Sequence, residues 1–287
     1  MKEFAEAVKA ELEKRIDAEV LVNEIMKNNG SVRTALTIRR AGYQTAPTFY
    51  VEQMEGSSGI VAQNILTALE RLTGEDEIVE RLEELMEDQD ELKISIFPRL
   101  VNFEWNEALL KTIPHRRFLD FAVTYVIELG DGLSGRITDE MMGRLSVWNE
   151  ERLYKAAISN LRAKGYQILP IHEMISHMME REGAWGIVPE TLPMLVITTP
   201  DYTFGAAVLL DEELLKEVGR MCGDYYILPS SVNEVIVIPD LSSEMNPAEL
   251  RQLVMAVNQS SVSREEWLSE SVYKFDGGER GVLRIAD

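Results

Sequence analysis

The sequence of 287 residues contains one cysteine and no long apolar run. A single cysteine excludes an internal disulfide, as is usual for proteins of a reducing compartment. No window reaches the roughly 18 uncharged apolar residues that a membrane-spanning helix needs. The N-terminal stretch Met-Lys-Glu-Phe-Ala-Glu-Ala-Val-Lys is charged throughout, so it does not resemble the apolar core of a secretion signal. We therefore expect a cytoplasmic protein that does not enter the membrane.

Positive charge is scarce, because 29 Lys and Arg residues stand against 49 Asp and Glu residues and the net charge is −20. Nucleic acids and anionic lipid surfaces are bound largely through Lys and Arg, so we expect neither as a direct ligand. The most acidic stretch, residues 70–91, is typical of a solvated helix face. A negative surface keeps a protein soluble, and it also attracts a basic protein partner.

The signatures of common enzymes and cofactor sites are missing. The sequence has no Walker loop, Gly-x-Gly-x-x-Gly fingerprint, Cys-x-x-Cys pair or EF-hand loop. His172 and His177 resemble a zinc-protease helix, but that motif needs a spacing of four, and a spacing of five turns the second imidazole about 140° away. Cys222 is predicted near a helix C-terminus, where the helix dipole disfavours a thiolate. We therefore expect no metal ion and no other cofactor.

The predicted fold is organised around residues 223–240. Two apolar runs, Tyr225–Leu228 and Val235–Ile238, flank a Pro-Ser-Ser corner, and such short runs rich in β-branched and aromatic residues are typical of buried strands. A second hairpin is predicted around Asn28-Asn29-Gly30, because Asn and Gly accept positive φ. With the amphipathic helices between the strands, the sequence predicts an α+β protein with mainly antiparallel sheet.

The length allows one large domain or two smaller ones. The preferred division places an N-terminal α+β part at residues 1–104 and a C-terminal α+β part at residues 105–287, with one continuous domain as the alternative. Residues 183–193 contain two glycines and two prolines, which favours a loop or hinge. A strand–strand–helix order recurs and leaves an internal duplication open. The three repeated units would be residues 118–145, 194–222 and 225–258.

Three elements are predicted from local patterns alone. The apolar runs between Leu92 and Phe103 are predicted to form strand that Pro98 bends or confines to a sheet edge. Met194–Thr198 and Ala206–Leu210 are predicted to pair as a hairpin. Ser263–Glu266 has the spacing of a capping box, which predicts the start of a short helix.

One compact basic cluster, His115, Arg116 and Arg117, stands in this acidic chain. The forked guanidinium group of arginine matches carboxylates and other planar anions. The cluster is therefore a candidate anion-binding patch. Local charge balance is the other interpretation of the same residues.

The second group of candidate binding residues is Ser230, Ser231, Asn233 and Glu234, at the corner and mouth of the predicted central hairpin. Serine hydroxyls at such a corner usually satisfy backbone groups. A hydrolase site that also uses His115 is the alternative, although the Gly-x-Ser-x-Gly elbow of many hydrolases is absent.

Several phrases of the sequence occur together in a way that resembles a known family. They are Lys27-Asn28-Asn29-Gly30, Leu228-Pro229-Ser230-Ser231-Val232 and Leu268-Ser269-Glu270-Ser271-Val272-Tyr273. The chain resembles, over nearly its whole length, an uncharacterised family of anaerobic Gram-positive gut bacteria that has no known activity. It is more distantly similar to another family of unknown function in Gram-positive bacteria.

The chain departs from this family pattern at Asn233, where the pattern usually has His. An amide neither accepts a proton at neutral pH nor binds zinc well. A hydrogen-bonding role could survive the change. The departure therefore favours a structural or binding role for this position over catalysis.

The leading functional hypothesis is a non-enzymatic protein-binding or adaptor protein with an unidentified protein partner, for which a basic surface would suit the acidic chain. It rests on the absence of an assembled catalytic set in the sequence and on the acidic charge. The first alternative is a hydrolase with its site near the Pro229-Ser230-Ser231 corner. The second is an acidic DNA-mimicking inhibitor, for which carboxylates would have to be spaced like phosphates along one face.

Overall fold

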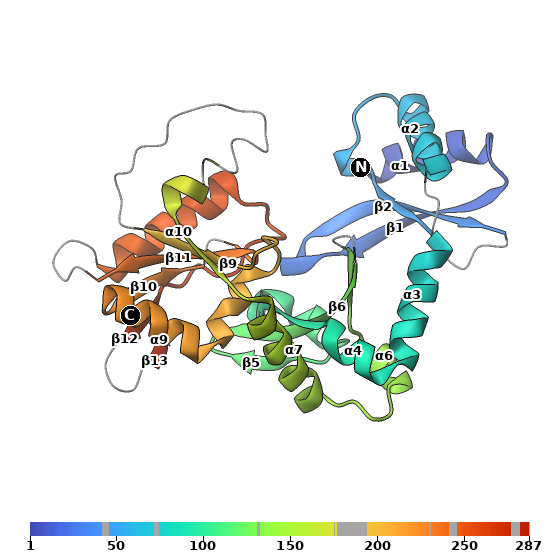
Figure 1. Cartoon of the computed structure of the whole chain (residues 1–287). Coiled ribbons are helices and arrows are strands. Elements are labelled where there is room, and N and C mark those ends of the chain that lie inside the picture. Colours follow the sequence, from blue (N-terminus) through green and yellow to red (C-terminus); the bar gives the residue numbers. More distant parts are fainter. Residues whose placement is uncertain are drawn as a thin grey trace. The chain divides into compact units, whose positions relative to one another are not determined.

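The computed structural model describes nine ranges of the chain, which divide into two compact units, Met1–Leu92 and Lys93–Asp287 (Figure 1). Helices combine with three antiparallel sheets, so the fold is α+β, as the sequence predicts. The structure describes residues 1–41, 46–71, 75–130, 133–174, 176, 194–229, 231–240, 246–276 and 282–286.

The first unit contains a three-stranded sheet in the order β1-β2-β3. β1 (Ala18–Met26) pairs with β2 (Val32–Arg40) in one unbroken antiparallel register, and β3 (Thr48–Tyr50) pairs with β2. Asn29 and Gly30 take φ values of 58° and 66° in the turn between β1 and β2. The hairpin predicted from Asn-Asn-Gly is therefore confirmed.

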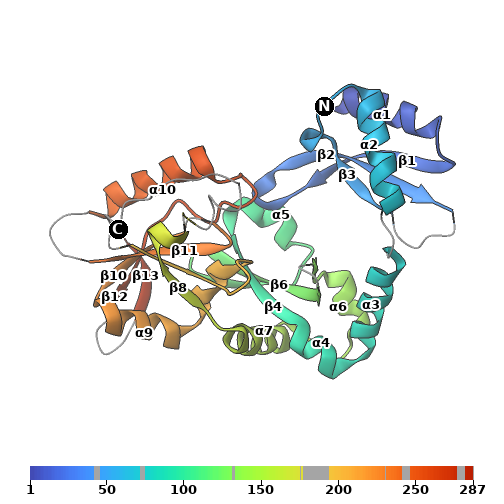
Figure 2. The same cartoon turned by 45° about the horizontal axis from the view of Figure 1, so that its top comes forward.

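Two helices, α1 (Lys2–Glu13) and α2 (Ser58–Arg71), lie beside each other on this sheet in both Figure 1 and Figure 2. Their buried side chains and those of β1 and β2 form one apolar core, with fully buried Leu12 and Ile65 among them. The 3₁₀ turn Val51–Gln53 joins the sheet to α2.

α3 (Glu75–Glu87) and α4 (Gln89–Ser95) follow in the acidic stretch. Glu83, Glu84 and Asp90 are exposed there, while Leu85 and Leu92 are buried. These two helices have the solvated acidic face that the sequence predicts.

The second unit begins with a four-stranded sheet around β6 (Phe121–Gly130). β4 (Ile96–Asn102) pairs with one side of β6, while β5 (Arg116–Phe118) and β7 (Leu133–Arg136) pair with the other side. A division of the chain at residue 104 would separate β4 from β6. The 3₁₀ helix η3 (Glu104–Asn106) and the short helix α5 (Glu107–Leu110) connect β4 to β5.

The apolar run after Leu92 is helical until Ser95, so the predicted strand begins four residues late, at Ile96. Pro98 lies inside β4, opposite Tyr125. Because β4 is an edge strand, the missing N–H of proline does not break a ladder on both sides. The edge position predicted from Pro98 is therefore confirmed.

Two capped helices follow β7. The Thr138 hydroxyl accepts a hydrogen bond from the Met141 amide at 3.2 Å at the start of α6 (Asp139–Arg144). The Asn149 side chain accepts one from the Arg152 amide at 3.0 Å at the start of α7 (Glu150–Lys164). Thr138 and Asn149 are typical caps, because short polar side chains satisfy the free amides of a helix start.

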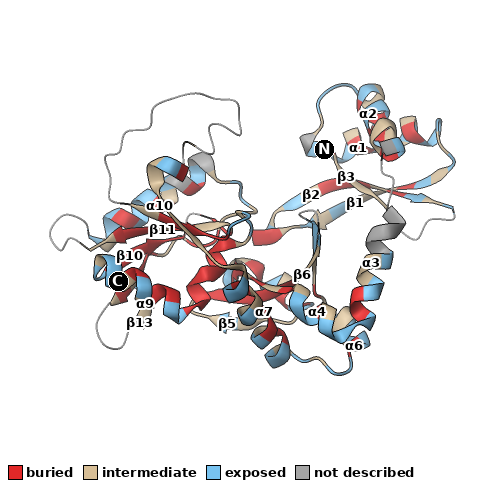
Figure 3. Cartoon of the chain, viewed as in Figure 1, coloured by how far each residue is buried: buried red, intermediate tan, exposed pale blue. Residues whose placement is uncertain are grey.

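A six-stranded sheet in the order β13-β12-β10-β11-β9-β8 forms the remainder of this unit. The predicted central hairpin is confirmed as β10 and β11, and Figure 3 shows both strands rich in buried residues. The strands are β8 (Gln167–Pro170), β9 (Leu195–Thr198), β10 (Tyr225–Leu228), β11 (Glu234–Pro239), β12 (Tyr273–Asp276) and β13 (Val282–Ile285).

Two helices cover opposite faces of this sheet (Figure 1). Leu250 and Val254 of α10 (Pro247–Ser261) pack against Tyr226 and Leu228. On the other face, the Tyr225 hydroxyl donates to the Leu215 carbonyl of α9 (Glu212–Cys222) at 2.9 Å. Neighbouring residues of β10 therefore point to opposite faces of the sheet, and both faces are covered by a helix.

Two predicted elements are wrong. Gly205–Leu210 forms a 3₁₀ helix, η4, and not a strand, because β9 already pairs with β8 on one side and β11 on the other. The second proposed repeat, residues 194–222, therefore lacks its second strand. Ser263–Glu266 forms a turn and not a helix, although its Ser263 hydroxyl does donate to Glu266 at 2.6 Å.

Residues 171–174 are helical. The predicted loop at residues 183–193 and the side chain of His177 lie outside the described residues. Among the described residues, no helix is both long and apolar enough to cross a membrane.

Asp211, at the start of α9, links this helix to the end of α7 and to Tyr166 just before β8. Its carboxylate accepts hydrogen bonds from Arg162 at 3.0 Å, from the Glu213 amide at 3.1 Å and from the Tyr166 hydroxyl. Burial alone would raise the pKa of Asp211, but these hydrogen bonds hold that pKa below its usual value.

A lowered pKa means that Asp211 stabilises the fold above the ordinary aspartate pKa of about 4 and loses this contribution as the pH falls through its folded-state value. We expect Asp211→Asn to lose about 1–3 kcal/mol of unfolding free energy at pH 6. The difference from wild type should shrink at pH 3. Urea unfolding at both pH values tests this, and a pH-independent difference would contradict it.

Candidate functional site

The predicted basic cluster does not act as one patch. Arg116 forms hydrogen bonds at 3.0 and 2.8 Å to the two oxygens of Glu150, and one at 2.5 Å to Glu151. Its guanidinium also lies 4.1 Å from the ring centre of Tyr154. These carboxylates raise the pKa of Arg116. Arg116 therefore balances charge between β5 and α7 and is not available to a ligand.

His115 and Arg117 both lie against the ring of Phe103. The His115 ring centre is 6.1 Å from that of Phe103, and its Nδ1 is 3.0 Å from the Ile113 carbonyl. The Arg117 guanidinium is 4.5 Å from the Phe103 ring centre, and its Nε donates to the Leu119 carbonyl at 3.2 Å. Arg117 is exposed.

The Ser231 hydroxyl closes the turn between β10 and β11. It donates to the Glu234 carboxylate at 2.6 Å and accepts a hydrogen bond from the Asn233 amide at 3.0 Å. Ser231 is only 5% exposed. Its hydroxyl thus serves the backbone of the turn, as hydroxyls at such corners do. Ser230 lies outside the described residues.

Asn233 connects the central hairpin to the loop before η4. Its Oδ1 accepts a hydrogen bond from the Phe204 amide at 3.2 Å, and its backbone carbonyl accepts one from the Thr198 hydroxyl at 2.7 Å. Its Nδ2 lies 3.5 Å from a Glu266 oxygen. The side chain therefore has the hydrogen-bonding role that the sequence analysis leaves open for this position.

The hydrogen bond to Asn233 supports an unfavourable backbone conformation at Phe204. Its φ of 51° is in the left-handed region, which is unfavourable for a bulky side chain. The Phe204 ring centre lies 5.0 Å from the Arg99 guanidinium carbon. Asn233 thus helps to position Phe204, and the Phe204 ring in turn packs on Arg99.

The hydrogen bond from Phe204 gives a prediction for Asn233. We expect Asn233→Leu to lose about 1–3 kcal/mol of unfolding free energy, since the partly buried Phe204 amide loses its acceptor. Asn233→His should lose less, because an imidazole nitrogen can accept the same bond. Urea unfolding measures both. Equal losses in the two variants would show that side-chain shape matters here and not hydrogen bonding.

Three arginines share one face of the four-stranded sheet. Residues directly opposite each other in an antiparallel pair point to the same face, and alternate residues of a strand share a face. Arg99, Arg117 and Arg136 lie opposite alternate residues of β6, so all three project from one face, which we call the arginine face. The pairs are Arg117 with Ala122, Arg99 with Thr124 and Arg136 with Val126.

Two of these guanidinium groups are sheltered from water and have no hydrogen-bond or ion-pair partner among the described residues. Arg99 and Arg136 are partly buried, and the Nε of Arg99 is fully buried without a hydrogen bond. Burial, with repulsion from Arg136, lowers the pKa of Arg99 to about 10 against attraction from Glu266 and Glu265. Burial also lowers the pKa of Arg136. Within the described part of the chain, neither arginine forms a hydrogen bond or an ion pair.

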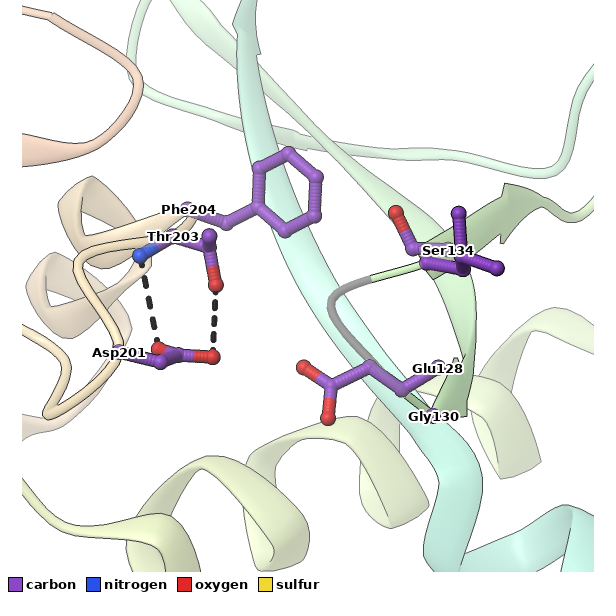
Figure 4. Close-up of a pocket in the computed structure, with 7 residues that line it drawn as sticks. Glu128, Gly130, Ser134, Asp201, Thr203 and Phe204 are labelled. Carbon is purple, nitrogen blue, oxygen red and sulfur yellow. Dashed lines mark hydrogen bonds between the residues drawn. The ribbon is translucent and has the colours of Figure 1, made fainter. Parts of the chain in front are cut away.

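A pocket of about 220 Å³, drawn in Figure 4, is lined by Phe204, which packs on Arg99, and by Ser134, which lies two residues from Arg136 in β7. Glu128 and Ser134 form one wall, and they face each other across β6 and β7 on the same face as Arg136. Asp201 and Thr203 form the other wall with the ring of Phe204. Gly130 and Leu133 complete the lining.

Lys164 stands between the two carboxylates of this pocket. Its ammonium group is 2.6 Å from Glu128 and 2.7 Å from Asp201. Burial alone would lower the pKa of Lys164, but the two carboxylates raise it. Asp201 also accepts hydrogen bonds from the hydroxyl of Thr203 at 2.8 Å and from its amide at 3.4 Å (Figure 4). The walls are therefore preorganised by contacts within the protein.

Neither a metal centre nor an activated thiol is found in the described ranges. No group of three His, Cys, Asp or Glu residues is arranged there to hold a metal ion. The Cys222 thiol donates to the Val218 carbonyl at 3.1 Å, and burial raises its pKa. A thiol with a raised pKa is a poor nucleophile at neutral pH.

Sequence reasoning finds Arg117 but misses Arg99 and Arg136. The sequence does contain one signal for Arg99, which is a charged residue directly after Pro98 inside an apolar run. A charged residue in a buried strand usually has a partner or a ligand. No comparable signal marks Arg136, which lies in a polar strand.

A family model covers residues 1–277 of the chain, and it describes a family of unknown function (DUF5688). The protein belongs to this family, in agreement with the resemblance seen in its sequence. No curated protein and no solved structure matches the chain.

Proposed function

We propose that this protein is a cytoplasmic, non-enzymatic binding or adaptor protein whose second unit recognises an anionic group of a protein partner through Arg99 and Arg136. The observation that carries this proposal is the pair of partly buried guanidinium groups without a carboxylate partner in the described chain. The chain has 49 acidic residues, so carboxylates are abundant elsewhere.

Burial of an unpaired charge is unfavourable, and buried arginines are normally paired. A carboxylate or phosphate would supply the missing partner, because a guanidinium binds such groups with two parallel hydrogen bonds. The overall charge of −20 supports a partner whose surface around this anionic group is basic.

Neither alternative gains a specific supporting observation from the described residues. Ser231, the described serine of the proposed hydrolase corner, is buried and donates to Glu234. A DNA mimic would need a row of carboxylates at phosphate spacing.

Calorimetric titration of the full chain with citrate and with inorganic phosphate tests the proposal. We expect saturable binding that weakens at least about tenfold in Arg136→Met, since each charge-assisted contact contributes on that order. Arg251→Met is the matched control, because Arg251 is exposed on α10. Equal affinity in the two variants, or no binding by the wild type, would refute the proposal.

A further inference from the structure

We propose that the arginine face and its adjoining pocket together bind a C-terminal lysine of the protein partner, an inference that rests on the proposed function. The α-carboxylate would lie on Arg99 and Arg136, and the lysine ammonium would lie at Glu128 and Asp201. The inference comes from three features of the site: its charge, its spacing and its apolar middle.

The two ends of the site carry opposite charge. Arg99 and Arg136 provide two positive groups that form no ion pair within the described ranges. Glu128 and Asp201 share the single ammonium of Lys164, so these three groups together keep one negative charge. Each carboxylate has about four lone-pair positions, which leaves room for a second ammonium donor. A ligand that is negative at one end and positive at the other would satisfy both.

The backbone positions of Arg136 and Glu128 are one two-residue step apart, which is close to the length of a lysine side chain. Arg136 lies opposite Val126, and Ser134 lies opposite Glu128, so one two-residue step separates the pairs. Such a step spans about 6.7 Å along a strand. The carboxylate carbon and the ammonium nitrogen of an extended lysine are roughly 7 Å apart, from ordinary bond lengths.

The middle of the site is apolar. Phe204 lines the pocket and its ring centre also lies 5.0 Å from the Arg99 guanidinium, so this apolar side chain borders both the pocket and Arg99. Leu133 lies on the same pocket wall as Ser134. The four methylene groups of lysine can pack against these side chains, as such stems commonly do. The volume of about 220 Å³ accommodates a chain of five heavy atoms at about 30 Å³ each.

A free lysine is a poorer candidate than a C-terminal one. The α-ammonium of the free amino acid would be placed next to two unpaired guanidinium groups, and like charges repel. In a peptide this nitrogen is a neutral amide. An internal lysine, in turn, lacks the α-carboxylate.

Fluorescence anisotropy with three dye-labelled peptides tests this inference on the full chain. They are Gly-Gly-Gly-Lys with a free C-terminus, the same peptide with a C-terminal amide, and Gly-Gly-Gly-norleucine with a free C-terminus. We expect the first to bind at least about tenfold more tightly than either of the others, because each of those lacks one charged end.

Glu128→Gln should abolish the preference for lysine over norleucine, while Glu140→Gln, an exposed acid on α6, should keep it. Ser134→Leu, which fills the pocket from an exposed strand position, should also abolish this preference. It replaces Glu128→Gln in the test if that variant folds poorly. Equal affinity for the lysine and norleucine acids would overturn the inference and leave the anion site standing. Absence of binding to these peptides, citrate and phosphate alike would overturn both.

Discussion

Replacing Arg99 with methionine should stabilise the unliganded protein and weaken its binding of anions at the same time. Arg99 has a buried Nε that forms no hydrogen bond to any residue the structure describes, and burial lowers the pKa of its guanidinium to about 10. Replacement of a poorly paired buried charge by an apolar side chain of similar length often stabilises a protein by about 1–4 kcal/mol.

Loss of the contact with Phe204 opposes this gain. A cation–π contact contributes about 0.5–2 kcal/mol, but a methionine sulfur also packs well on an aromatic ring. The net expectation is therefore a gain of about 1–2 kcal/mol in unfolding free energy. A residue retained for stability would behave in the opposite way.

Urea unfolding and citrate titration of the same Arg99→Met sample measure both effects. Arg251→Met is again the control, and it should leave stability and citrate affinity unchanged. If Arg99→Met is less stable than wild type by more than about 1 kcal/mol, Arg99 contributes to folding and the argument from its missing partner fails.

Gly205→Ala should have the largest effect on stability. An added Cβ would lie 2.1 Å from the Asn233 carbonyl oxygen, 2.3 Å from the Thr198 hydroxyl and 2.8 Å from the Thr198 Cα. Two of these three atoms belong to the backbone, of β9 and of the turn before β11, so a side-chain rotation cannot relieve the clash. We expect a loss of about 3 kcal/mol or more, as for severe overpacking in a core.

Gly143→Ala is the matched control for this substitution. Gly143 lies in α6, and an added Cβ there meets nothing within 4 Å. Alanine is the better helix former, so this variant should be as stable as wild type or more stable by about 0.5–1 kcal/mol. Thermal unfolding of the two variants measures the contrast. A Gly205→Ala variant with wild-type stability would show that the close approach of η4 to β9 and β11 is not required.

Gly205→Ala also tests the link between the central hairpin and the arginine face. Gly205 follows Phe204, whose amide donates to Asn233. A shift of this segment would displace the ring from Arg99. Among variants that still fold, citrate affinity should therefore fall with Gly205→Ala and stay unchanged with Gly143→Ala.

Local chemistry predicts much of this fold. The Asn-Asn-Gly turn, the caps Thr138 and Asn149, and the capping box of Asn246 with Glu249 each depend on a few neighbouring residues, and all are present. The paired apolar runs of the central hairpin are likewise local, and they form β10 and β11.

Elements that depend on distant neighbours are predicted less well. Ala206–Leu210 is an apolar run that has no period of its own, so it reads as a strand as readily as a buried helical turn. Its conformation is decided by β9, which has β8 and β11 on its two sides and no free edge. The sequence around residues 206–210 contains no trace of that arrangement.

The arginine face is beyond local prediction for a related reason. Arg99, Arg117 and Arg136 come from three different strands, and a slip of one residue in any register would move an arginine to the opposite face. Arg116 and Arg117 show this directly. They are neighbours in the sequence, but Arg116 binds Glu150 on one face and Arg117 shares the other face with Arg99.

The most direct test of the central claim is an NMR titration that follows the arginine Nε–H signals of the full chain as citrate is added. The account predicts that two signals, those removed by Arg99→Met and by Arg136→Met, shift together and saturate at one ligand equivalent. The signal of Arg116, which already binds Glu150 and Glu151, should not move. Unchanged Arg99 and Arg136 signals at saturating citrate would contradict the account.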